Sequence, residues 1–122
     1  MTILCVDNTP IMLQALEENA TEAFPHANVQ MFLGAEAALR YAEKNGCDIL
    51  LCEINPPRLE GLFLAEQIQK INPRVNIIFV TVCSESEHAK AVMRLKPSGY
   101  LTKEATDAEI LLELRNLRYP VA

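Results

Sequence analysis

Short runs of apolar residues alternate along this chain with longer segments in which apolar residues recur at helical spacing. Such short runs, bounded by turn-forming residues, are typical of strands that are covered on both faces. Parallel neighbours in a sheet need a crossover connection, which is usually a helix. The alternation therefore predicts an α/β fold with a doubly wound parallel sheet and helices on both of its faces.

The limits of the expected elements follow from helix-start and helix-stop signals. Pro25 and Pro73 end two helices, and Gly46 suits a left-handed C-cap. Ser84–Glu87 and Thr106–Glu109 match capping boxes that open the last two helices. The expected strands cover residues 3–6, 29–33, 48–54, 75–82 and 99–102. The expected helices cover residues 10–24, 36–43, 61–71, 84–95 and 106–117.

Length and charge exclude several classes of protein. The chain has 122 residues, of which 50% are hydrophobic, and this suits one domain with its own core. It carries 11 basic and 16 acidic residues, a net charge of −5, which argues against direct binding to nucleic acid or to an anionic membrane. No apolar run approaches the roughly 18 residues of a membrane span, and no signal peptide is evident. We therefore expect a soluble, cytoplasmic protein.

The chain contains four cysteines, and none of them forms a C-x-x-C pair. We interpret Cys5, Cys47, Cys52 and Cys83 as reduced thiols that act as small buried hydrophobes. A redox role is the alternative for Cys5 and Cys52, which lie near the ends of two strands expected to be neighbours.

Polar residues follow the expected strands at the points where these strands end. Asp7 and Asn8 follow the first strand, Glu53 ends the third, Thr81 lies near the end of the fourth, and Lys103 follows the fifth. In sheets of this class, ligands bind outside the carboxyl ends of the strands. Carboxylates at close quarters repel each other unless a cation lies between them, and Lys103 or Mg²⁺ could supply that charge. We expect Glu53 and Lys103 to be in contact.

These strand ends belong to a longer pattern. Its segments are Val6-Asp7-Asn8, Asp48 to Asn55, Pro57, Glu60-Gly61-Leu62, Val80-Thr81 and Gly99 to Lys103. With this pattern, the sequence from Ile3 to Leu117 resembles the receiver domain of bacterial two-component response regulators. The resemblance implies a flavodoxin-like fold, in which a five-stranded parallel sheet of order 2-1-3-4-5 is flanked by five helices.

The resemblance also implies a phosphotransfer site. Receivers take a phosphoryl group from a sensor histidine kinase onto an aspartate at the end of the third strand, and Glu53 occupies that position here. By the same resemblance, Asp7 and Asn8 stand at the two acidic positions of a Mg²⁺ site. Glu53 and a backbone carbonyl of Asn55 would complete the metal ligands.

Three further positions correspond to the family's switch residues. Thr81 is the hydroxyl and Lys103 the ammonium that bind phosphoryl oxygens in receivers. Tyr100 matches the aromatic residue that turns inward on activation, although a half-exposed strand aromatic would give the same pattern.

Three departures from the family pattern weaken the implied chemistry. Asn8 removes a hard anionic ligand from a site for a hard cation. Glu53, with one methylene more than aspartate, moves its oxygen off the in-line geometry of phosphoryl transfer. Glu104 replaces the usual proline after the lysine. We therefore expect a degenerate site, with Mg²⁺ binding weak or lost.

The resemblance extends to the organisation of a longer protein. Residues 1–122 are expected to be the receiver domain at the N-terminal part of a regulator, because the ending Asn116 to Pro120 resembles receivers that precede a DNA-binding output domain. A homodimer is expected through the mixed charges of the last two helices. These charges are Lys90, Arg94, Glu109, Glu113 and Arg115.

Three functions were compared on this basis. The leading hypothesis is a signalling module, not an enzyme, that regulates an attached or separate DNA-binding output domain. In it, the fixed negative charge of Glu53 partly imitates a phosphorylated aspartate. The alternative is a Mg²⁺-dependent receiver that accepts phosphate on Glu53. A hydrolase with Asp7 as nucleophile is disfavoured, because that chemistry needs a second aspartate where this chain has Thr9.

Overall fold

A computed structural model describes residues 1–54, 60–82 and 89–121 of the chain. The strands are β1 (Thr2–Val6), β2 (Asn28–Phe32), β3 (Ile49–Ile54), β4 (Asn76–Thr81) and β5 (Gly99–Thr102). The helices are α1 (Pro10–Ala23), α2 (Ala35–Asn45), α3 (Glu60–Ile71), α4 (Ala89–Arg94) and α5 (Asp107–Arg115). Within these described residues, none of the helices combines the length and the apolar character that crossing a membrane requires.

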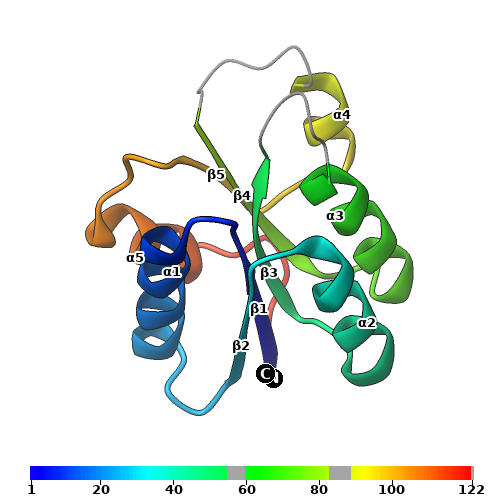
Figure 1. Ribbon diagram of the computed structural model, residues 1–122, viewed down its shortest axis with the longest axis horizontal. Coiled ribbons are helices and arrows are strands. Elements are labelled where there is room, and N and C mark those ends of the chain that lie inside the picture. Colours follow the sequence, from blue (N-terminus) through cyan, green and yellow to red (C-terminus); the bar gives the residue numbers. More distant parts are fainter. Residues whose placement is uncertain (55–59, 83–88, 122) are drawn as a thin grey trace.

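The strands form one parallel sheet in the order β2-β1-β3-β4-β5, with β1 beside both β2 and β3 (Figure 1). The predicted doubly wound α/β fold and its strand order are thereby confirmed. Because all strands run the same way, their carboxyl ends share one edge of the sheet, which we call the carboxyl edge. Their first residues share the opposite edge, which we call the amino edge.

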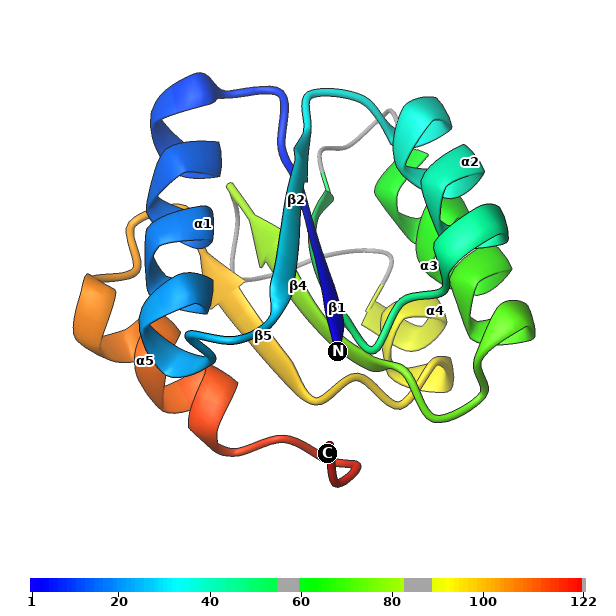
Figure 2. The same ribbon diagram turned by 90° about the horizontal axis from the view of Figure 1, so that it is seen from below.

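Alternation along the strands divides the core into two layers. Figure 2 shows α1 and α5 on one face of the sheet and α2, α3 and α4 on the other. Residues such as Ile3 and Leu51 pack towards α1 and α5. Their neighbours Leu4 and Leu50 pack in the other layer. Both faces are therefore shielded from water, which explains why the central strands are mostly apolar.

Helix limits agree with the local signals to within a few residues, which is ordinary for fraying ends. Gly46 ends α2 with φ of 80°, a conformation that favours glycine. The capping box of Thr106 and Glu109 opens α5 as predicted. Thr9 is the N-cap of α1, but its side chain makes no capping hydrogen bond. The box predicted at Ser84–Glu87 lies outside the described residues.

Cys5, Cys47 and Cys52 are buried free thiols, as expected, whereas Cys83 lies outside the described residues. Burial raises the pKa of Cys47 to about 12 and raises the pKa values of Cys5 and Cys52 as well. Cys5 belongs to the core layer formed with α1 and α5, and Cys52 to the layer formed with α2, α3 and α4. The two thiols therefore lie on opposite faces of the sheet. This placement gives no support to a redox pair.

The first turn of α3 approaches the carboxyl edge very closely at Gly61. A Cβ atom at this position would clash with the backbone carbonyl oxygen of Glu53 and would lie 2.9 Å from Cys52 Sγ. The glycine therefore lets α3 pack directly against the end of β3, where Glu53 is placed.

We predict that Gly61→Ala lowers the free energy of unfolding by about 2 kcal/mol, because a backbone atom cannot yield as a flexible side chain does. Urea unfolding followed by circular dichroism measures the loss. Gly34→Ser is the matched control, since nothing lies within 4 Å of a Cβ there and serine suits the N-cap of α2. Equal stability of the two variants would contradict the close packing of α3.

Candidate functional site

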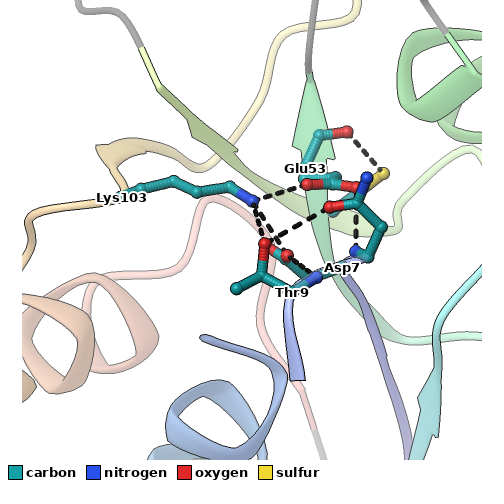
Figure 3. Close-up of polar contacts among 6 residues, drawn as sticks. Asp7, Thr9, Glu53 and Lys103 are labelled. Atoms are coloured by element: carbon teal, nitrogen blue, oxygen red, sulfur yellow. Dashed lines mark hydrogen bonds and ion pairs between the residues drawn. The ribbon is translucent and has the colours of Figure 1, made fainter. Parts of the chain in front are cut away.

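The side chains of Asp7, Glu53 and Lys103 meet at the carboxyl edge of the sheet (Figure 3). The Nζ atom of Lys103 donates to Asp7 Oδ1 at 2.8 Å and to Glu53 Oε2 at 2.6 Å. The predicted contact between Glu53 and Lys103 is therefore confirmed. One ammonium serves two carboxylates, as expected from the repulsion between like charges.

The position of Lys103 follows from the end of β5. Its backbone N–H donates to the carbonyl oxygen of Thr81 at 2.7 Å, which continues the pairing of β4 with β5 by one residue. β4 lies between β3 and β5, so the contact with Glu53 joins strands that are not neighbours. The long lysine side chain is what bridges this gap (Figure 3).

Both carboxylate oxygens of Glu53 are engaged. Oε2 accepts from Lys103, and Oε1 accepts from the backbone N–H of Asn8 at 2.9 Å. The side chain is only 15% exposed, so solvent screens these contacts weakly. Glu53 therefore connects the end of β3 with the loop after β1 and with the residue after β5.

Asp7 is the most deeply buried charge of the site, with no exposed surface. Its Oδ1 accepts from Lys103 and from the backbone N–H of Thr9, each at 2.8 Å. Its Oδ2 is buried and has no hydrogen-bond partner within the part of the chain that the structure describes. Burial raises the pKa of Asp7 above its ordinary value of 3.8, although the bonds from Lys103 and Thr9 oppose this effect. The ionised form of Asp7 thus depends on the ammonium.

Lys103 is held in its charged form. Burial works against the ammonium, but the hydrogen bonds and charges of Asp7 and Glu53 outweigh it and raise the pKa of Lys103 above 10.5. The ammonium of Lys103 therefore lies between the carboxyl groups of Asp7 and Glu53, which places one positive charge where a bound cation would otherwise be needed.

Two contributions of the loop after β1 were missed by the sequence analysis. Thr9 was not among the predicted site residues, yet its hydroxyl accepts from Lys103 Nζ at 3.3 Å. Asn8 was expected to act through its side chain, yet its backbone N–H holds Glu53. Residue types alone do not show where a loop N–H points. The sequence signal for Thr9 was its spacing from Asp7, because a hydroxyl two residues after a site carboxylate can reach the same site.

The remaining predicted site residues are placed as follows. Thr81 ends β4 and is 2% exposed, opposite Ile54 on β3 and Thr102 on β5. Tyr100 is half-buried and packs against the core layer formed with α2, α3 and α4. Asn55 lies outside the described residues.

The donors that the structure describes do not fit a Mg²⁺ site with several carboxylate ligands. Lys103 already takes up one oxygen each of Asp7 and Glu53. The second acidic position holds the amide of Asn8, and the other oxygen of Glu53 accepts from a backbone N–H. Among residues 1–54, 60–82 and 89–121, no group of three His, Cys, Asp or Glu side chains is arranged to hold a metal ion. A divalent cation would compete with the ammonium for the charges of Asp7 and Glu53.

The comparison with protein families shows to which family the chain belongs. A family model described as the response regulator receiver domain matches residues 3–115, which is nearly the whole chain. The chain belongs to the response regulator receiver family. Its solved relatives share the fold: a CheY-like receiver from Methanospirillum hungatei has a TM-score of 0.80 at 23% identity, over 93% of this chain and 90% of that one. The BeF₃-activated DrrB receiver has a TM-score of 0.79 at 19% identity, over 93% of each chain.

The relatives with a described role are longer proteins. The receiver is 29% identical over 82 residues to the response regulator UvrY of Escherichia coli K12, which covers 67% of this chain and 38% of UvrY. It is 28% identical over 80 residues to the response regulator GacA of Pseudomonas viridiflava, over 66% of this chain and 37% of GacA. The matched receiver therefore spans about two fifths of these relatives.

We predict that Lys103→Met lowers the free energy of unfolding at pH 7 by about 3 kcal/mol, because it leaves two carboxylates without their shared cation. The loss should shrink as the pH falls towards 4. Without the ammonium, the pKa of Asp7 in the folded state lies further above that of the unfolded chain, so the folded state binds more protons in this range and gains stability there. Urea unfolding across this pH range measures both effects.

Lys44→Met is the matched control, because Lys44 is exposed on α2. It removes the same charge and should change the unfolding free energy by no more than about 0.5 kcal/mol at either pH. A Lys103→Met loss that stays constant between pH 7 and pH 4 would contradict the electrostatic account of the site.

Proposed function

We propose that this chain is the receiver module of a two-component response regulator whose signalling state is set by the ion pair of Glu53 and Lys103 instead of by a phosphoryl group. The observation that carries the proposal is the 2.6 Å contact between Lys103 Nζ and Glu53 Oε2. In receivers, this lysine binds the phosphoryl oxygens. Here the lysine binds a carboxylate of the chain itself, that of Glu53.

The length of Glu53 supports this assignment. Its carboxylate lies further from β3 than that of an aspartate, and so partway towards the place of a phosphoryl group. A phosphorylated aspartate carries more charge and three acceptor oxygens, so the imitation is partial. A conformational equilibrium shifts only where contacts differ between the two states. We infer that Glu53 biases the module towards its active state without a kinase.

Weak Mg²⁺ binding is the second element of the proposal. Asp7, Asn8, Glu53 and the carbonyl of Asn55 correspond to the metal ligands of the family, but Asn8 lacks the carboxylate. A cation at this site also competes with an ammonium that already neutralises part of its charge. The module therefore acts in signalling without catalysing its own phosphorylation.

The proposed context is cytoplasmic transcriptional control. UvrY and GacA, which share the receiver, are named response regulators, and MctR of Rhizobium johnstonii, 24% identical over 110 residues, is named a transcriptional regulatory protein. We propose that this receiver likewise controls a DNA-binding output domain and dimerises through α4 and α5. The net charge of −5 assigns DNA contact to the output domain and not to this segment. A sensor histidine kinase would be a binding partner more than a phosphate donor.

Phosphorylation by acetyl phosphate with Mg²⁺ tests the site directly. We expect no labelling of the wild type, because Glu53 and Asn8 together remove the acceptor geometry and a metal ligand. The double variant Asn8→Asp, Glu53→Asp should become labelled in a Mg²⁺-dependent manner, as detected by intact-protein mass spectrometry. Asn8→Asp alone, which keeps Glu53, is the control and should stay unlabelled.

Labelling of the wild type on Glu53 would overturn the proposal and establish the alternative, a phosphorylation-competent receiver. An unlabelled double variant would show that the site is lost beyond these two residues.

The bias exerted by Glu53 is tested by self-association. Before it is treated with acetyl phosphate, the double variant should dimerise more weakly than the wild type in sedimentation velocity. Phosphorylation of the double variant should restore the association. The physical reason is that aspartate carries the same charge as glutamate but one methylene closer to β3, and so further from the place of a phosphoryl group. Equal association of the wild type and the unlabelled double variant would remove the phosphate-imitation part of the proposal.

A further inference from the structure

The segment after α5, residues 116–121, runs along the amino edge of the sheet without regular structure; we call it the tail. Figure 2 shows it leaving α5 and crossing below the strands towards the C-terminus. The sequence of Arg118, Tyr119 and Pro120 suggested the start of a linker. The structure instead places the main chain of this segment against a buried side chain of β4.

That side chain is Asn76, the first residue of β4, which has no exposed surface. Its Nδ2 donates to the carbonyl oxygen of Tyr119 at 2.9 Å, and its Oδ1 accepts from the backbone N–H of Tyr119 at 2.8 Å. One side-chain amide thus bonds both polar groups of one residue, in the way that a neighbouring strand would. Two paired bonds to the same residue fix its direction as well as its position.

Ser98, just before β5, completes the polar group. Its hydroxyl donates to Asn76 Oδ1 at 2.7 Å and accepts from the backbone N–H of Arg118 at 3.0 Å. The backbone of Ser98 is itself fixed by a bond to the carbonyl oxygen of Ile77 at 2.8 Å. Consecutive N–H groups of the tail, those of Arg118 and Tyr119, therefore have acceptors on the sheet.

Side chains of the tail add further contacts. The guanidinium carbon of Arg74 lies 5.4 Å from the centre of the Tyr119 ring, and that of Arg118 lies 6.0 Å from it. Leu117 and Val121 pack against the core layer of α1 and α5. Apolar contacts on both sides of Tyr119 shield the bonds to Asn76 from water and so strengthen them.

An asparagine at this position needs an explanation, because it interrupts the apolar run from Val75 to Val80. A buried polar side chain costs free energy unless its hydrogen bonds are made. Asn76 makes them with Tyr119 and Ser98. The hydrogen bonds to the tail therefore account for the polar side chain of Asn76 in this strand.

We propose that Asn76 is a binding site for the main chain of Tyr119, and that the tail is a strap held on the amino edge of the sheet. The strap is independent of the function proposed above, because it lies at the edge opposite Glu53 and Lys103. A domain joined after α5 would leave from this edge. β4 carries Asn76 at one end and Thr81 at the other, so a single strand connects the strap with the candidate switch hydroxyl.

Limited trypsin digestion of the whole chain, followed by mass spectrometry, tests the strap at the bond between Arg118 and Tyr119. In the wild type this bond should be protected. Asn76→Ala should raise its cleavage rate by about tenfold or more, because cleavage follows the opened population. The bond after Arg115, at the end of α5, is the internal control and should change less than about twofold. Cleavage after Arg118 at the wild-type rate in a folded variant would overturn the proposal.

A second variant tests the proposal if Asn76→Ala destabilises the whole domain, so that trypsin cleaves after both Arg115 and Arg118 faster. Ser98→Ala leaves the amide of Asn76 in place and removes the hydroxyl that accepts from the Arg118 N–H and donates to Asn76 Oδ1. Hydrogen exchange by NMR should then be about tenfold faster at the Arg118 amide and unchanged at Ile110 within α5. Unchanged exchange at Arg118 would show that the tail is not held by these bonds, and would overturn the proposal without affecting the labelling test.

Discussion

The ammonium of Lys103, shared between Asp7 and Glu53, is the interaction on which the carboxyl edge of this receiver depends. The packing of apolar strands brings their ends together, and two carboxylates placed there repel each other in a medium of low polarity. The cation removes this conflict and joins the ends of β1, β3 and β5, of which β3 and β5 are not neighbours. Asp7 has a buried oxygen without a partner among the described residues, so its charge rests on Lys103.

The fold was predictable because its signals are redundant. Each strand is an apolar run, the box of Thr106 and Glu109 starts α5, and Gly46 ends α2. The contact of Glu53 with Lys103 was predictable for a topological reason, since parallel strands end at one edge. The strand order itself came from the family resemblance, because an alternating pattern of strands and helices is compatible with several orders.

Other features were not predictable from residue types, because they depend on backbone direction and register. The N–H of Asn8 and the hydroxyl of Thr9 point into the site only because of how the loop after β1 turns. Cys5 lies opposite Leu51 and not opposite Cys52, which places the two thiols on different faces. Residues 75–82 were expected only as an apolar strand, and it is the structure that brings the tail to Asn76.

The contacts at the two edges of the sheet differ in whether they depend on charge. The carboxyl edge is held by charges, whose balance changes when one charge is added or removed. At the amino edge, the tail is held by a neutral amide bonded to main chain, which titration does not alter. If a fixed carboxylate stands in for the phosphoryl group, a kinase no longer changes the charge at the carboxyl edge. A change of state must then come from a partner that contacts the two states differently, since only differential binding shifts such an equilibrium.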